Sequence, residues 1–149
     1  MSGSIELYRD VWVFAEQNNG KIQSVTFELL GEGRKLADSL GVDLCAVLLG
    51  AGIQDRAQEL VARGAGKVFV VDKPELAVFN DESYSAVLID LVNKHKPAVL
   101  LCGATTVGRS MSARTAALLH TGLIADCVGL AIDPAAKNLL QPRPTLAGS

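Results

Sequence analysis

One stretch, residues 98–127, most constrains how this chain can fold. It starts with a short apolar run at 98–102, typical of a buried strand in a parallel sheet. A turn of glycine and hydroxyl residues follows at 103–108, and Gly122 is placed to end a helix. Between them the apolar side chains recur at helical spacing: Met111, Thr115, Leu118 and Leu119. This order predicts a strand, a turn, a helix packed on the sheet and a further strand from 123.

The turn at 103–108 is a candidate ligand site. Open α/β folds bind ligands outside the carboxyl ends of their strands, and a helix start offers free N–H groups and a positive dipole end to an anion. The residues that could contact an anion or a partner there are Thr105, Thr106, Gly108, Arg109 and Arg114. The alternative is that the turn only connects a strand to a helix, because it matches no phosphate-loop motif.

Arg109 would lie in the first turn of that helix, where a cation is disfavoured by roughly 0.3–1 kcal/mol. An offsetting carboxylate or bound anion is therefore expected, and Asp126 is the candidate partner. This pair would fix the turn at 105–108. Alternatively, Arg109 is a solvated side chain.

Strand and helix patterns alternate along the rest of the chain. Apolar runs predict strands at 11–15, 44–49 and 68–71, and 16–21 is expected to be a turn. A first helix is expected from Thr26 as N-cap to Gly41, a second from Ile53 to Gly64, and a third from Asn80 or Asp81 to Lys96. The expected inner face of the first helix is Leu29, Gly33, Leu36, Ala37 and Leu40, with Gly33 in close contact with the sheet. That of the second is Ile53, Ala57, Leu60 and Val61.

Two features bear on nucleotide binding. The G-x-G at 50–52 lacks a third glycine, so a tight βα turn is favoured over a dinucleotide site. The segment after the first strand, 15–20, is no phosphate loop, and Glu16 would repel a phosphate. No nucleophile–base pair or carboxylate dyad follows from the spacing, which argues against independent catalysis.

The pattern changes near the C-terminus. Residues 128–132 show the alternating pattern of a strand, 133–138 resemble a turn, and 139–141 can form a returning strand. This order predicts a β-hairpin added to the sheet. We therefore expect an irregular lead-in at 1–9, an α/β domain at 10–127, and a hairpin and linker at 128–149.

Composition excludes several classes of partner. The net charge of −2 gives no electrostatic footprint for nucleic acid, and no apolar segment approaches the length of a membrane span. The three cysteines are widely separated and the start is not a signal peptide, which indicates a reducing, cytoplasmic compartment. The two histidines fall at expected helix ends, where capping is favoured over metal ligation.

The block at 103–127, GATTVGRSMSARTAALLHTGLIADC, resembles the signature of the N-terminal domain of electron transfer flavoprotein alpha subunits, roughly G-A-T-x-x-G-R-x-x-x-x-R-x-A-A-x-L-x-T-G-L-x-A-D-C. The segments VWVFAE at 11–16 and LLGEGRKLADSLG at 29–41 are similar to the same family. In the tail, Arg143, Pro144 and Gly148 match the family pattern, whereas Leu146, Ala147 and Ser149 depart from it.

This resemblance implies a doubly wound, mostly parallel α/β fold related to adenine-nucleotide alpha hydrolases, with strand order 3-2-1-4-5. It implies a scaffold and subunit-docking domain of an electron carrier, with a beta subunit and dehydrogenases as partners. Arg143 joins the candidate contacts on this ground. FAD is implied for the complete protein, in a further domain, and no residue of the family's FAD-contacting set has a counterpart here. We therefore expect no cofactor in this chain and no catalytic site of its own.

Two alternatives stay open. The chain could instead be a stand-alone nucleotide-binding module of the same fold. Without a beta subunit, it could associate with itself through the docking surface.

Overall fold

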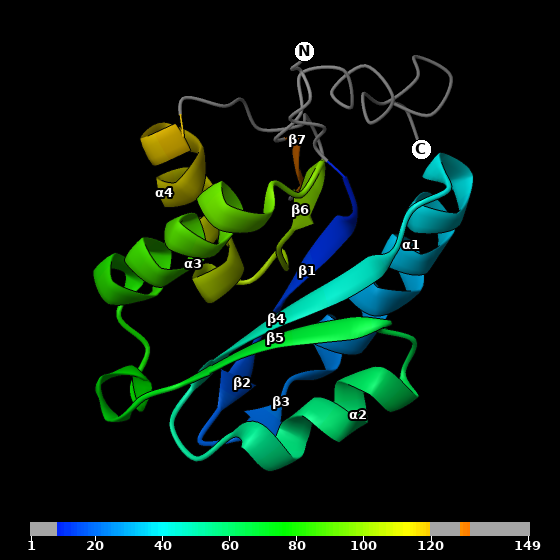
Figure 1. Cartoon of the computed structure of the whole chain (residues 1–149). Helices are drawn as coiled ribbons and strands as arrows, with labels where there is room; N and C mark the ends of the chain where they lie inside the picture. The colour runs from blue at the N-terminus through cyan, green and yellow to red at the C-terminus, as the bar shows by residue number, and fades with distance from the viewer. Residues whose placement is uncertain (1–8, 120–128, 132–149) are drawn as a thin grey trace.

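The computed structural model describes residues 9–119 and 129–131, and they form a three-layer α/β structure around one sheet (Figure 1). The strands lie in the order β5 (Lys67–Asp72), β4 (Leu44–Gly50), β1 (Val11–Ala15), β6 (Val99–Leu101) and β7 (Gly129–Ala131). The first four are parallel, and β7 runs antiparallel to β6. The doubly wound, mostly parallel fold is thus confirmed.

The first four predicted strands lie in the implied order 3-2-1-4. The fifth place is taken by β7, from the segment in which we expected the first strand of the hairpin. Residues 123–125, where a strand was expected to begin, and 139–141, the expected return of the hairpin, lie outside the described part of the chain.

Helices cover both faces of the sheet, which explains why the central strands are apolar throughout. Figure 1 shows α1 (Ser24–Leu40) and α2 (Ala57–Ala62) on one face, and α3 (Asp81–His95) and α4 (Thr106–Leu119) on the other. Along β1, Val11, Val13 and Ala15 belong to the core under α1 and α2, whereas Trp12 and Phe14 belong to the core under α3 and α4. Short 3-10 turns lie at η1 (Gln54–Arg56) and η2 (Pro74–Leu76).

Gly33 brings α1 close to the sheet, as predicted. A Cβ added there would lie 2.7 Å from Leu44 Cδ1 and 3.3 Å from Val13 Cγ2. The buried face of α1 consists of Thr26, Leu30, Gly33 and Ala37, and the predicted Leu29, Leu36 and Leu40 are partly buried against the same core.

Three local predictions were wrong. The helix α1 begins at Ser24, and its N-cap is Gln23 rather than Thr26. Residues 16–21 are more than a turn, because β2 (Gln17–Asn18) and β3 (Lys21–Ile22) pair as a small antiparallel hairpin. Its turn residues Asn19 and Gly20 have φ of 53° and 85°, as in the turns that join tight hairpins. Val61, expected on the inner face of the second helix, is 46 % exposed, because α2 turns only Leu60 of its residues into the core.

The ends of α3 match the prediction. Asn80 is the N-cap, and its Oδ1 accepts a hydrogen bond from the Ser83 N–H at 3.0 Å. Acidic residues lie in the first turn and basic residues in the last, which complements the helix dipole.

No helix in the described residues is long and apolar enough to cross a membrane.

Candidate functional site

The candidate site lies where the strand order reverses. The connections from β1 lead to β4 and β5 on one side, whereas β6 lies on the other side of β1. The crevice outside the carboxyl ends of β1 and β6 is therefore the topological switch point, where doubly wound folds bind their ligands. Glu16 follows β1 directly, and the turn at 103–105 joins β6 to α4 at the same edge.

A hydrogen-bonded chain connects the two sides of this crevice. The Thr105 hydroxyl donates to Glu16 Oε2 at 2.6 Å. The Gly108 N–H, in the first turn of α4, donates to the Thr105 hydroxyl oxygen at 2.9 Å. Thr105 thus caps α4 and links the Glu16 carboxylate to the start of that helix. Glu16 is buried, with 7 % of its surface exposed.

The backbone of Glu16 is fixed from the other face. Its N–H donates to the Thr26 hydroxyl oxygen at 2.8 Å, and the Thr26 hydroxyl donates to the Glu16 carbonyl at 3.2 Å. The Gln23 N–H donates to the same carbonyl at 2.8 Å. Thr26 therefore ties the end of β1 to the start of α1, which explains why a hydroxyl is fully buried there.

Two glycines allow this close packing. A Cβ at Gly103 would lie 2.6 Å from Glu16 Oε2, and a Cβ at Gly108 would lie 2.0 Å from the Gly103 carbonyl oxygen. The turn and the first turn of α4 are thus in backbone contact. Neither position has space for a side chain.

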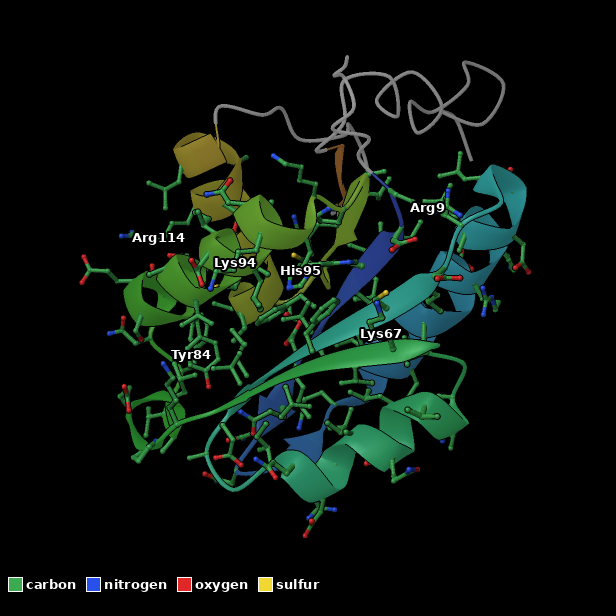
Figure 2. The ribbon with its side chains drawn as sticks, in the orientation of Figure 1. Arg9, Lys67, Tyr84, Lys94, His95 and Arg114 are labelled. Atoms are coloured by element: carbon green, nitrogen blue, oxygen red, sulfur yellow. The ribbon has the colours of Figure 1, made fainter. Side chains whose placement is uncertain are left out.

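The Gln17 side chain packs against the carboxyl end of the neighbouring strand β4. Its Nε2 donates to the Leu49 carbonyl at 3.0 Å, and its Oε1 accepts from the Gly20 N–H at 2.7 Å. A Cβ at Gly50 would lie 2.7 Å from Gln17 Nε2. Tyr84, labelled in Figure 2, donates its hydroxyl to the Leu76 carbonyl at 2.5 Å, and burial raises its pKa.

Asp72 forms hydrogen bonds with the backbone of the G-x-G turn. It ends β5, and its carboxylate accepts from the N–H groups of Gly52 at 2.8 Å and Ile53 at 2.9 Å. These bonds, Gly52 first, lower the pKa of Asp72. The N–H groups of this turn therefore bind a carboxylate of the chain itself.

The predicted contact residues divide into three groups. Thr105, Thr106, Gly108 and Arg109 lie together at the start of α4, and Arg109 is exposed. Asp126, the expected partner of Arg109, and Arg143 lie outside the described residues, so their roles stay predictions.

Arg114 lies farther along α4 and faces α3 (Figure 2). Its Nε donates to the Ser85 hydroxyl at 3.0 Å, and its guanidinium lies 3.6 Å from Glu82 Oε2. It therefore links the two helices that cover this face. Its role in binding a partner stays a prediction.

Sequence reasoning expected Glu16 to repel a phosphate but did not place it in this site. The signal was present, because an acidic residue directly after the first strand of a doubly wound fold must lie at the switch point. What the sequence could not supply is its partner, 89 residues away.

The described cysteines offer no reactive thiolate at neutral pH. Burial, with the Glu16 charge as a lesser cause, raises the pKa of Cys102 to about 12. Burial likewise raises the pKa of Cys45 to about 11. Within residues 9–119 and 129–131, no three His, Cys, Asp or Glu side chains group as a metal site.

A separate groove of about 570 Å³ lies beside the β2–β3 hairpin. Its lining includes Lys21, Phe27, Arg56 and Glu59, from β3, α1, η1 and α2. It does not include the switch-point residues.

Comparisons with known proteins agree with the fold. Residues 11–149 match the electron transfer flavoprotein domain family. The chain is 47 % identical over 142 residues to the electron transfer flavoprotein subunit alpha of Clostridium acetobutylicum, which covers 95 % of this chain and 42 % of that protein.

Two further relatives have other names. The acryloyl-CoA reductase electron transfer subunit beta of Anaerotignum propionicum is 50 % identical over 132 residues, 89 % of this chain and 36 % of that protein. Protein FixB of Azorhizobium caulinodans is 46 % identical over 145 residues, 95 % of this chain and 39 % of that protein. The chain therefore spans less than half the length of each of these relatives.

Proposed function

Because the chain belongs to the electron transfer flavoprotein family, we propose that it is the N-terminal scaffold and subunit-docking domain of an alpha-type subunit. The single observation that carries this proposal is the similarity along 95 % of the chain to a subunit named as alpha. The complete protein would pass electrons from dehydrogenases to an acceptor, as a carrier rather than an enzyme.

FAD, which the family implies, does not fit the described residues of this chain. A dinucleotide needs free N–H groups at a glycine-rich turn for its pyrophosphate. Here the N–H groups of Gly52 and Ile53 bind Asp72, and the Gly108 N–H binds Thr105, whose proton is donated to Glu16. We therefore place FAD in a further domain of the complete protein.

The docking surface that we propose is the end of the sheet beyond β6. The strand β7 pairs with Val99–Leu101 there, and the exposed side chain of Arg109 belongs to α4, the helix that contacts β7. Thr106, Arg114, Asp126, Arg143 and the segment 128–148 are the further contacts we propose. Such a surface suits a beta subunit: among the described residues β7 pairs only with β6, and an edge strand offers backbone groups to a partner.

The compartment that we propose is cytoplasmic. Cys45 and Cys102 are free and buried, which is consistent with a reducing environment.

Binding to a cognate beta subunit tests the docking role. We expect the 149-residue chain and the beta subunit to elute as a one-to-one complex on a sizing column, with the stoichiometry confirmed by native mass spectrometry. Arg109→Ala should weaken the complex, whereas Glu28→Ala, on the exposed side of α1, should leave it unchanged. Self-association of the chain with no complex would contradict the proposal.

A further inference from the structure

The carboxyl edge of the sheet is filled by the chain's own side chains at the places where doubly wound folds bind ligands. We propose that Glu16 determines ligand specificity there: its carboxylate occupies the position of a ligand phosphate and keeps phosphate-bearing ligands out of the crevice between β1 and β6. This inference does not depend on the docking role.

The first argument is position. A ligand phosphate at a switch point is bound by the turn after a strand and by the N-terminus of the next helix. The Glu16 carboxylate lies beside this place. It accepts the proton of the Thr105 hydroxyl, whose oxygen in turn accepts from the Gly108 N–H in the first turn of α4.

The second argument is hydrogen-bonding capacity. A threonine hydroxyl has one proton to donate. That of Thr105 is donated to Glu16 at 2.6 Å, and the Gly108 N–H is donated to the Thr105 oxygen at 2.9 Å. The Glu16 carboxylate therefore takes the one proton that Thr105 could donate to a phosphate oxygen, and the Gly108 N–H is bound by Thr105 itself.

The third argument is space and charge. Glu16 Oε2 lies 2.6 Å from the place that a Cβ at Gly103 would take, so the carboxylate is pressed against the turn. A phosphate group cannot enter between them. Because the residue is only 7 % exposed, its charge would also repel an incoming phosphate with little screening by salt.

The fourth argument is that the backbone that carries the carboxylate is fixed at the end of β1. The backbone of Glu16 is held by Thr26 on both its N–H and its carbonyl, and by the Gln23 N–H. Asp72 makes more direct contacts at the G-x-G turn, where its carboxylate accepts from two backbone N–H groups. At each of two turns on this edge, a carboxylate of the chain itself is therefore hydrogen-bonded.

The test removes the carboxylate and measures phosphate binding. The probes are inorganic phosphate and AMP, titrated into the full chain while the amide resonances of Thr105 and Gly108 are followed by NMR. We expect no saturable shift in the native chain and a saturable shift in Glu16→Ser. Glu28→Ser removes the same charge from the exposed side of α1 and should behave like the native chain.

Glu16→Gln separates occupancy from charge. The amide has nearly the volume of the carboxylate and can still accept from Thr105, so we expect at least about tenfold weaker phosphate binding than in Glu16→Ser. Equal binding by the two variants would overturn the proposal that the position is filled.

Two other results would overturn it as well. One is a saturable shift at Thr105 or Gly108 in the native chain. The other is a folded Glu16→Ser variant that binds no more phosphate than Glu28→Ser. If Glu16→Ser does not fold unaided, phosphate should restore its folding, because a ligand at about 100 times its Kd raises the folded-to-unfolded ratio about 100-fold. Failure of phosphate and AMP to restore folding would also contradict the proposal.

Discussion

The Thr105 hydroxyl donates a 2.6 Å hydrogen bond to the carboxylate of Glu16, across 89 residues of sequence. This contact joins the end of β1 to the start of α4 at the point where the strand order reverses. At the place where doubly wound folds bind ligands, this chain therefore has a hydrogen-bonded junction between two of its own elements.

Thr105→Val should destabilise the chain. It keeps the shape of the side chain but leaves a buried carboxylate without its donor, and hydrogen bonds to charged groups contribute about 1.5–3 kcal/mol. Urea denaturation should show a loss of that size in the free energy of unfolding. Thr106→Val, at an exposed neighbouring position, is the control and should change it far less. The variant also removes the cap on the Gly108 N–H, so equal losses in the two variants would mean that neither contact of the Thr105 hydroxyl stabilises the chain.

Gly108→Ala and Gly31→Ala should have opposite effects. A Cβ at Gly108 would lie 2.0 Å from the Gly103 carbonyl oxygen, so the helix and the turn must separate. A Cβ at Gly31 meets no atom within 4 Å, and alanine is favoured over glycine in a helix interior by about 1 kcal/mol. Thermal denaturation should therefore give a lower Tm for the first variant and a higher Tm for the second. A Gly108→Ala variant as stable as the native chain would contradict the close contact.

Local patterns in the sequence predicted most of this fold. The apolar runs predicted the four parallel strands, and the Asn80 cap with the charges at both ends predicted α3, because the relevant interactions lie within one element. Gly33 was placed correctly on the sheet, since a glycine on the inner stripe of a helix has few other uses. These features depend on neighbours in the sequence.

The site depends on contacts between distant segments, and here the sequence was insufficient. Threonine is a preferred N-cap residue, which led to the prediction for Thr26. Its hydroxyl instead forms hydrogen bonds with the Glu16 backbone, because the start of α1 lies against the end of β1. Val61 fits the helical pattern, yet α2 buries Leu60 and leaves Val61 46 % exposed. Gly31 has no packing role in the structure.

Asp72 should make the stability of the chain sensitive to acid. Its pKa is lowered in the folded chain below the ordinary value of 3.8 by the N–H groups of Gly52 and Ile53. A lowered folded pKa gives stability that is present above the unfolded pKa and is lost as the pH falls through the folded pKa. The free energy of unfolding of the native chain, measured by urea denaturation, should therefore fall below about pH 4.

Asp72→Asn should reduce that acid-dependent loss, and Asp55→Asn, on the exposed turn η1, should leave it as in the native chain. If the free energy of unfolding falls with pH in the same way in all three proteins, the turn does not depend on the Asp72 charge.

The purified chain should contain no stoichiometric flavin. At the carboxyl edge of the sheet, the N–H groups of Gly52 and Ile53 already bind Asp72, and that of Gly108 binds Thr105. Its visible absorbance spectrum should lack flavin bands after expression in cells that make FAD. Bands at a one-to-one ratio of flavin to chain would contradict the placement of FAD in a further domain.

Hydrogen exchange should locate the docking surface at the end of the sheet. Within the described residues, β7 pairs only with β6, so a partner that adds to this end would protect its backbone groups. We expect the exchange of residues 128–143 to slow when a cognate beta subunit is added, and that of β5, at the opposite end of the sheet, to stay the same. Equal protection of 128–143 with and without the beta subunit, together with the absence of a complex on a sizing column, would show that this surface is not where the subunit binds.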